Sequence, residues 1–402
     1  MSQTHGISVR DFGATGDGTT DDAPALQHAL DAGASRVVVP AGNYPLGRGL
    51  KIGSDTHFLA HPSAVFRMAD GVGQGPGDFL LTNKNYEGGN QNIRIEGGVW
   101  DGNNLGNPRG PDAPDSYSGV MISFTHVDGL TMRDMRLLDA ESYFVRFGKV
   151  VNFLVEDIDF EINTLRPNQD GIHVSGFCHD GIIRRLRGLG LRTPNDDMAA
   201  ILADDALHRA QNLGAFNGPI SRIRVEHLRA SSCHSFVRLL SVDHPISDIE
   251  ISDVEGGCVC CAINMDACRD CRVKLFDDAD RPEGVGSITN IRASDFRVHK
   301  VADSSVQPLI DFRTRVDNFQ LERFTRDLAR DAGPSSPTLK IEKAGAVDVV
   351  LDGLTTPAPG AQTARQATLS PSAQYRATQE MGPEDSFSLE GAGFDLLRVD
   401  RK

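Results

Sequence analysis

Short runs of alternating apolar and polar residues recur along the chain from about residue 90 onward. They are LTMRDMRL (130–137), FLVEDIDF (153–160), IIRRLRGL (182–189), IRVEHLRA (223–230), IEISDVEG (249–256), ITNIRASDFRV (288–298), FQLERF (319–324) and VVLDGL (349–354). Alternation with a period of two points successive side chains to opposite faces of a strand, so each run predicts a strand with one buried face.

The last apolar position of each run returns at similar intervals. The step from Met135 to Ile158 is 23 residues and that from Ile158 to Leu186 is 28, whereas two later steps reach 42. Repeats of this length stack on their neighbours as a solenoid, in which successive strands pair in parallel. We therefore predict an all-β fold, a single-stranded right-handed parallel β-helix in which the longest steps carry insertions. An antiparallel sandwich or a propeller would need regular Asn-Gly or Asp-Gly hairpin turns between the runs, and no regular turns of this kind separate them.

The N-terminal segment differs from the repeats. DDAPALQHALDAG (21–33) has acidic residues to cap a helix, proline in the first turn, leucines on one face and Gly33 to end it. These features predict a helix over about 22–32. Because the terminal repeat of a solenoid must be shielded from water and from edge pairing, we expect residues 1–50 to form a capping segment.

The remaining chain divides into two expected parts. Residues 51–356 are predicted to form the β-helix that carries catalysis. TTPAPGAQTARQATLSPSAQ (355–374) is rich in Pro, Ala, Ser and Thr, which is typical of a surface linker. We therefore expect residues 357–402 to be a linker and a C-terminal tail that packs on the β-helix, with GFDLLRV (393–399) adding one strand.

Composition and charge limit the classes of partner. The chain is 39% hydrophobic and 24% charged, an ordinary globular balance. Lys and Arg number 41 against 55 Asp and Glu, a net charge of −14, so nucleic acid and anionic membranes are not expected partners. No apolar run is long enough to cross a bilayer, and the start MSQTHGISVRDFG has no leader pattern. We expect a cytoplasmic protein, or a secreted one if a signal peptide has been removed; its oligomeric state is not indicated.

Five of the seven cysteines gather in one segment: Cys258, Cys260, Cys261, Cys268 and Cys271. Their spacing matches no common zinc pattern, and an odd total fits a reducing compartment better than a disulfide framework. Small apolar thiols also pack well as inward stacks in a solenoid. The cluster is therefore predicted to be reduced and free of metal.

Several motifs resemble a known superfamily. VRDFGATGDGTTDDAPALQHALDAG, followed by VVVPAGNYPLG, closely resembles the opening of pectate-lyase superfamily β-helices, which include polygalacturonases of glycoside hydrolase family 28, alginate epimerases and phage tailspike depolymerases. That resemblance implies the fold but not the reaction. IEGGVWDGNN (95–104) is similar to a family 28 segment. PNQDGIHV (167–174) and PNDDMAAI (194–201) are similar to that family's Asn-Thr-Asp-Gly and Gly-Asp-Asp motifs.

The aspartates of these motifs are the candidate catalytic residues. Asp170 precedes Asp196 by 26 residues, about one coil, so neighbouring coils are expected to bring Asp170, Asp196 and Asp197 together. Glycoside hydrolysis needs one protonated carboxyl and one ionised carboxyl, and like charges at short range separate their pKa values. The resemblance implies an inverting mechanism with Asp196 as acid and Asp197 as base, assisted by Asp170. The nearby Asp204–Asp205 pair is interpreted as turn chemistry and is left out.

The residues expected to bind substrate are Asn168, His234 and Arg238. Asn168 belongs to the first aspartate motif, and His234, in SSCHSFVRLLS, stands where the family has Gly-His-Gly. The Arg-Ile-Lys with which the family binds galacturonate has no match in CVCCAINMD (258–266), so the resemblance does not define the sugar. Arginine is the candidate for that role: Arg238, Arg166 or Arg192. No metal ion or cofactor is expected.

We therefore expect a glycoside hydrolase that cleaves a polysaccharide or oligosaccharide, including uronate-containing ones. Two alternatives stay open. A polysaccharide lyase or epimerase on the same fold would need a cation or an arginine to neutralise a uronate carboxylate, and here the carboxylates could hold calcium. A phage-type β-helix could also bind glycans without turnover.

Overall fold

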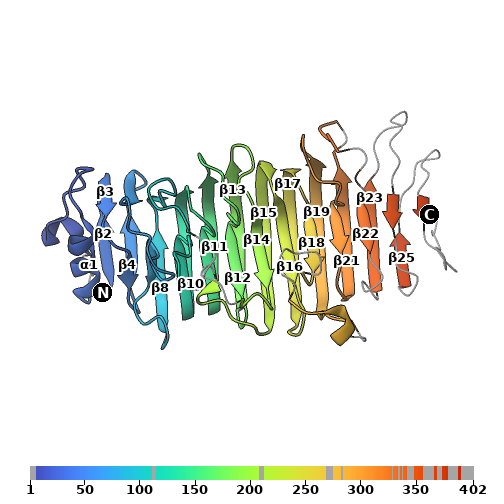
Figure 1. The fold of residues 1–402 in the computed structure, drawn as a ribbon, viewed down its shortest axis with the longest axis horizontal. Coiled ribbons are helices and arrows are strands. Elements are labelled where there is room, and N and C mark those ends of the chain that lie inside the picture. Colours follow the sequence, from blue (N-terminus) through green and yellow to red (C-terminus); the bar gives the residue numbers. More distant parts are fainter. Residues whose placement is uncertain are drawn as a thin grey trace, which may run out of the picture.

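A computed structural model shows the chain as one long stack of strands, which runs from the N-terminal strands at one end to the C-terminal strands at the other (Figure 1). It describes residues 6–110, 115–207, 212–268, 275–281, 284–327, 329–333, 336, 338–341, 348–355, 366–368, 374–378 and 388–390, with the backbone alone from residue 341 onward. All strand pairings between these residues are parallel. The predicted parallel β-helix is confirmed.

The strands fall into three stacked series. One series consists of short strands: β4 (Leu50–Ile52), β7 (Leu81–Asn83), β12 (Ile172–Ser175), β14 (Asp197–Leu202), β16 (Ser235–Leu240), β18 (Ile263–Asp266), β20 (Ile310–Phe312), β22 (Leu339–Ile341), β24 (Gln366–Thr368) and β26 (Ser388–Glu390). We call the outer surface of this series the short-strand face. The first residues of β10 (Ile122–Leu138) and β11 (Val145–Glu161) complete it, because Ile122 pairs with Leu81 and Val145 with Ile172.

The other two series are separate strands in the first coils and are joined within single long strands from β10 onward. One contains β2 (Arg36–Val39), β5 (His57–Ala60), β8 (Asn90–Glu96), β13 (His179–Leu189), β15 (Ile220–Cys233), β17 (Ile246–Cys258), β19 (Ile288–Lys300), β21 (Val316–Arg326), β23 (Asp348–Thr355) and β25 (Gln374–Thr378). The third begins with β3 (Gly42–Leu46), β6 (Ala64–Met68) and β9 (Val99–Asp101), and continues through the last residues of β10 and β11. β1 (Ile7–Ser8) pairs with β2 and so begins the second series. Two short 3-10 turns, Val9–Phe12 and Asp278–Asp280, lie outside the three series.

The repeat register deduced from the sequence is the observed one. Met135 pairs with Ile158 and Ile158 with Leu186. The series continues, pair by pair, through Leu228, Val254, Phe296, Phe324 and Leu354. Inward side chains at such positions form one core along the solenoid, and equivalent rings stack on each other, as Phe296 and Phe324 do at 5.5 Å between centroids. Burial of this apolar stack is the main stabilising force of the fold.

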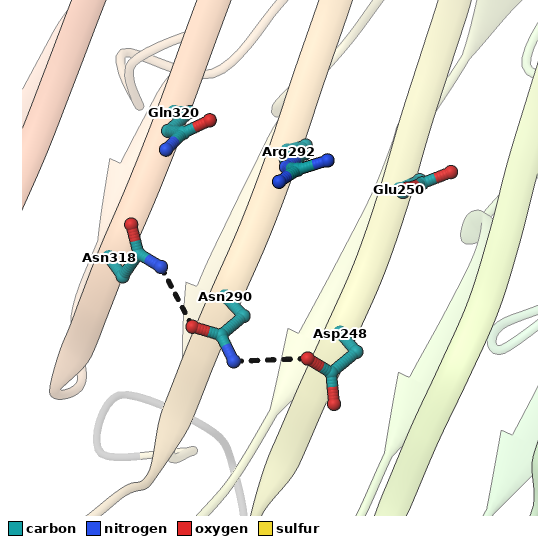
Figure 2. Close-up of a pocket in the computed structure, with 6 residues that line it drawn as sticks. All are labelled: Asp248, Glu250, Asn290, Arg292, Asn318 and Gln320. Atoms are coloured by element: carbon teal, nitrogen blue, oxygen red, sulfur yellow. Dashed lines mark hydrogen bonds between the residues drawn. The ribbon is translucent and has the colours of Figure 1, made fainter.

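Polar ladders mark the corners where the long strands bend. Asp248, Asn290 and Asn318 occupy one corner of successive coils with φ of 57°, 57° and 54°. The Asn318 amide donates to the Asn290 carbonyl oxygen (2.8 Å), and the Asn290 amide donates to Asp248 (3.0 Å), as Figure 2 shows. Short polar side chains tolerate this left-handed conformation better than other L-residues do. A second corner repeats the conformation at Asp134, Asp157, Arg185, His227, Asp253, Asp295 and Arg323.

The N-terminal helix forms as expected, but its cap differs. Helix α1 (Ala23–Asp31) buries its apolar face at the N-terminal end of the stack (Figure 1). Asp22 holds the N-cap position without capping the helix, because its carboxylate accepts hydrogen bonds from the backbone N–H groups of Thr15 (2.6 Å) and Gly16 (2.8 Å). Asp21 instead accepts a hydrogen bond from the Ala23 N–H (3.1 Å).

The solenoid extends beyond both boundaries placed on the sequence. β2 and β3 pair with β5 and β6, so coils already form within residues 1–50. Past residue 357, where a linker was expected, β24, β25 and β26 continue two of the strand series. Runs with few alternating apolar residues still pair here, because a neighbouring coil supplies a template edge. The expected strand at 393–399 lies outside the described residues. No described helix has the length and apolarity needed to cross a membrane.

Candidate active site

The three predicted catalytic aspartates lie together on the short-strand face, at the start of neighbouring coils. Ile172 pairs with Ala199, which sets Asp170 beside Asp197, and the Gly171 N–H donates to the Asp197 carbonyl oxygen (2.9 Å). The tight bend ahead of β12 needs glycine at this point, since a Cβ on Gly171 would lie 2.4 Å from the Met198 carbonyl oxygen. The parallel register therefore converts a 26-residue separation into adjacency.

Asp196 occupies the more accessible side of this group. Its carboxylate is 24% exposed, whereas that of Asp197 is 3% exposed. His234, on the next coil, places Nδ1 3.5 Å from Asp196 Oδ1 and 4.0 Å from Asp197 Oδ1. The predicted histidine thus contacts both members of the adjacent pair, with its own side chain 40% exposed.

Burial and mutual repulsion keep protons on part of this group. The pKa of Asp170 is raised well above its ordinary value, first by burial and then by the negative charges of Asp196 and Asp197. Burial, followed by the charge of Asp196, raises the pKa of Asp197 to about 7, although Arg238 and His234 oppose the shift. Carboxyls coupled in this way titrate as a set. Near neutral pH the cluster therefore holds both protonated and ionised carboxyl groups.

Arg238, a predicted substrate-binding residue, is already engaged by acidic groups. Its Nη2 lies 2.9 Å from Asp266 Oδ2, and its Nη1 lies 3.8 Å from Asp197 Oδ2. The sulfur of Cys268 is 3.1 Å from the same guanidinium group. Asp266 is the last residue of β18. It lies in the segment CVCCAINMD, which has no match to the family's Arg-Ile-Lys motif. The positive charge of Arg238 is thus partly neutralised by this chain itself.

The structure adds two residues to the cluster that the sequence had not indicated. His173 lies between two carboxylates, with Nδ1 2.7 Å from Asp170 Oδ2 and Nε2 3.5 Å from Asp205 Oδ2. Asp205, which was left out of the site as turn chemistry, lies in the loop after β14 and also extends its carboxylate toward His173. Asp204 does serve the turn, because it accepts hydrogen bonds from the backbone N–H groups of Val242, Asp243 and His244 (2.7–2.9 Å).

A sequence signal for His173 existed in the alternation of β12. Ile172 and Val174 point inward, so the residue between them points outward on the short-strand face, as Arg238 does in β16. No comparable signal marks Asp205, which follows β14 in an irregular loop. Its contact with His173 depends on the path of that loop over the coil.

The other residues expected to bind substrate have different surroundings from those of His234 and Arg238. Asn168 lies in a turn with φ of 61°, and its side chain has no hydrogen bond to a described residue. Arg166 is held by Glu141, with Nε 2.8 Å from Oε2. Arg192 is exposed on the loop ahead of Asp196. A role for any of the three in substrate binding stays a prediction.

The described cysteines are reduced and buried. Cys233 and Cys258 pair in register as members of the core, as expected for an inward stack. Cys260 differs: a hydrogen bond from Cys261, whose sulfur lies 3.5 Å away, lowers the pKa of Cys260 to about 6, with help from the charges of His234 and Lys300. Cys271 lies outside the described residues. Absence of a metal ion from this cluster stays a prediction.

Asp196, Asp197 and His234 are the described residues best arranged to hold a cation, because one ligand atom from each lies within 4.8 Å of the others. Two carboxylates and an imidazole suit a divalent ion of intermediate hardness better than calcium, which prefers oxygen alone. The same three groups can equally hold and donate protons.

A groove lies on the long-strand surface over β17, β19 and β21 and is lined by Asp248, Glu250, Asn290, Arg292, Asn318 and Gln320 (Figure 2). Its ladder side chains hydrogen-bond to one another, which satisfies them at a corner of the fold. The aspartates of the short-strand face are instead buried close to one another, and their pKa values are raised. The short-strand face is therefore the better candidate for an active site.

Comparison with known proteins agrees with the fold. Residues 6–104 match the family described as rhamnogalacturonase A/epimerase, pectate lyase-like. This match ends before Asp170, so it does not include the aspartate cluster. A polygalacturonase of Persea americana is 24% identical over 309 residues, which are 74% of this chain and 60% of the plant protein.

Other similar proteins come from phages. The preneck appendage protein of Bacillus phage PZA is 33% identical over 136 residues, which are 33% of this chain and 16% of the phage protein. The crystal structure of pre-mature bacteriophage phi29 gene product 12 superimposes on 92% of this chain with a TM-score of 0.64 at 18% identity. This chain covers 46% of that protein.

The N-terminal family match, the polygalacturonase similarity and the stack of parallel coils lead to one assignment. The chain is a parallel β-helix protein whose first coils, residues 6–104, match the pectate lyase-like family.

Proposed function

We propose that the chain is an inverting glycoside hydrolase whose catalytic groups are Asp170, Asp196 and Asp197. The observation that carries this proposal is the convergence of three carboxyls, two of them buried with raised pKa values, beside a histidine and an arginine. Such a cluster keeps an acid and a base available together, which hydrolysis of a glycosidic bond requires. The polygalacturonase similarity supports the same class of reaction.

The roles follow from accessibility and protonation. The adjacent pair supplies the proton that passes to the leaving glycosidic oxygen, and Asp170 takes a proton from the attacking water. The resemblance assigns the acid to Asp196, which is the more exposed of the two, whereas burial raises the pKa of Asp197 and favours Asp197 as the proton donor.

The pH–rate profile distinguishes Asp196 from Asp197 as the acid, because its basic limb reports the pKa of the acid. If Asp196 is the acid, Asp196→Asn abolishes that limb and Asp197→Asn retains it.

The first experiment is a screen of neutral and acidic glycans, with products analysed by mass and by ultraviolet absorbance. Hydrolysis adds water, whereas a lyase creates an absorbing double bond. NMR of the released anomeric centre then gives the stereochemistry. Inversion is expected, and it requires acid and base carboxyls about 6.5–9.5 Å apart. Retention of configuration would contradict the mechanism, and an unsaturated product would place the chain among the lyases.

Substitution of each aspartate by asparagine tests the site. Asp170→Asn, Asp196→Asn and Asp197→Asn keep the side-chain shape but remove a proton carrier, so turnover should fall by about 10²-fold or more. Asp248→Asn is the matched control, because Asp248 lies in the corner ladder of the long strands and bonds only Asn290 and Ser247 among the described residues. Its turnover should be unchanged. Full activity of Asp197→Asn would remove the site from consideration.

The second candidate function is glycan binding without turnover. The similarity to a phage preneck appendage protein and the superposition on phi29 gene product 12 favour it. A binder would retain affinity for its glycan in the asparagine variants and release no product from any member of the panel. Isothermal titration calorimetry of wild-type and variant proteins against the same glycans separates the two functions.

A further inference from the structure

His173 occupies a position inside the aspartate cluster that the hydrolysis scheme above leaves unused. Its side chain is 1% exposed and lies between two carboxylates: Nδ1 is hydrogen-bonded to Asp170 (2.7 Å), and Nε2 lies at ion-pair distance from Asp205 (3.5 Å). A neutral imidazole carries a single N–H and can donate to only one of two acceptors, whereas an imidazolium donates to both. Two flanking carboxylates therefore favour the charged ring.

The surroundings of the ring also favour a cation. The phenol of Tyr143 stacks on the imidazole with centroids 4.1 Å apart and planes 14° apart, and an aromatic face attracts positive charge. On the following coil, the residue in register with His173 is Ala200, which brings no charge. On the preceding coil, the register position holds Arg146, whose guanidinium is directed to Ser123 (2.8 Å) and Tyr86 (3.0 Å).

We propose that Asp170, His173 and Asp205 form a relay of alternating charges, in which a protonated His173, hydrogen-bonded to Asp170 and paired with the charge of Asp205, keeps Asp170 ionised so that it acts as the water-activating base. This proposal rests on the proposed hydrolase function. His173 and Asp205 are positioning residues within it, since they act through Asp170. Asp205 stabilises the imidazolium, and the Nδ1–H of that ring fixes one carboxylate oxygen of Asp170 and leaves the other for water. In the attack step a proton passes from water to this second oxygen while the water oxygen bonds to the anomeric carbon.

The relay explains how Asp170 can be ionised although its surroundings raise its pKa. Burial and the neighbouring charges of Asp196 and Asp197 favour the neutral form of Asp170, which cannot accept a proton. Arg238 opposes this effect, but it is also bonded to Asp266. A charge-assisted hydrogen bond from His173 adds the opposing interaction at the closest range in the site. A base and an acid can then coexist within one buried group of carboxyls.

Kinetic tests use Asp205→Asn and His173→Asn on a substrate found in the screen. Asparagine at 173 keeps a donor near Asp170 but removes the charge and the link to Asp205. Both variants should move the acidic limb of the kcat/KM profile to higher pH by about 1–3 units, because a lost opposite charge raises the pKa of the base. A uniform loss of activity with an unmoved pH profile would show a merely structural role and overturn the proposal.

The matched control is His179→Asn. His179 makes the same contact, Nδ1 to Asp180 Oδ2 at 2.7 Å, but on the exposed start of β13. Its profile should coincide with that of the wild type. Thermal unfolding of all variants identifies any that fail to fold, and His173→Gln replaces His173→Asn in that event.

A second measurement needs no substrate. In protein labelled with ¹⁵N-histidine, the His173 ring should carry protons on both nitrogens at pH 7, and Asp205→Asn should convert it to the neutral form. A neutral His173 in the wild-type protein would overturn the relay whatever the enzyme does. A charged His173 in a protein that hydrolyses no glycan would leave the relay intact and refute the hydrolase function instead.

Discussion

The buried carboxyl of Asp197 makes the stability of the fold depend on pH. Its carboxyl is almost fully buried at the first position of β14, and burial with repulsion from Asp196 raises its pKa to about 7. In the unfolded chain the same group has its ordinary value near 4. The folded state therefore binds a proton that the unfolded state has already lost, and its stability falls as pH rises from about 4 through 7.

This linkage predicts the behaviour of Asp197→Asn, which cannot ionise. Below about pH 4 the variant and the wild type should unfold at similar temperatures. At pH 8 the variant should be more stable, by on the order of 1–4 kcal/mol, because it no longer carries a buried negative charge beside Asp196. Differential scanning calorimetry between pH 4 and pH 8 measures the difference. A variant that is less stable than the wild type at every pH would contradict the prediction.

At the scale of the element, the corners of the long strands depend on residues that accept the left-handed conformation. Asn290 has φ of 57° and bonds to both Asp248 and Asn318. The same conformation recurs coil after coil with Asx, Arg or His in place of glycine. These side chains bond along the stack, so each corner restrains its neighbours.

Two substitutions at Asn290 separate backbone strain from hydrogen bonding. Asn290→Gly removes both amide bonds but accepts the positive φ, so it should cost about 1 kcal/mol or less. Asn290→Val adds a β-branched side chain in a conformation it rarely adopts, and should cost about 1–2 kcal/mol more. Urea unfolding measures both. Equal losses for the two variants would show that the hydrogen bonds, and not the backbone, set the stability of the corner.

At the scale of the whole molecule, helix α1 closes a stack whose end is otherwise an open edge. Leu26, Ala29 and Leu30 bury their side chains against the first coil, in the same core that runs along the solenoid. The terminal strands of a solenoid present unpaired N–H and C=O groups unless another segment covers or pairs with them.

Deletion of residues 6–33 should therefore convert a dispersed protein into one that associates through its exposed end. Light scattering after size-exclusion chromatography should show larger species that grow with protein concentration. Leu26→Ala is the milder comparison: it should lower stability by about 2–5 kcal/mol through a cavity under the helix, without association. A deletion variant with the mass of the full chain would show that the helix is dispensable for closure.

The sequence alone determined the repeat, its register and the convergence of the aspartates. Period-two alternation marks the buried face of each strand, so Met135, Ile158 and Leu186 align on successive coils without any knowledge of the rest. Parallel stacking then makes residues one coil apart neighbours, which is why Asp170 and Asp197 were predicted to meet. Such features are local or periodic. In a solenoid each coil contacts only the coils next to it, so a periodic sequence pattern translates directly into contacts.

Tertiary structure decided everything that depends on loop paths and on burial. Asp205 approaches His173 from the irregular segment after β14, and the spacing of the residues does not encode the path of that segment. Which carboxyl keeps its proton depends on how completely Asp170 and Asp197 are buried and on where Arg238 and Asp266 lie. These energies arise from the low dielectric of a packed surface and from charges on several coils at once. Residue types and spacing can name the groups of an active site, but only their arrangement in space sets the protonation on which chemistry depends.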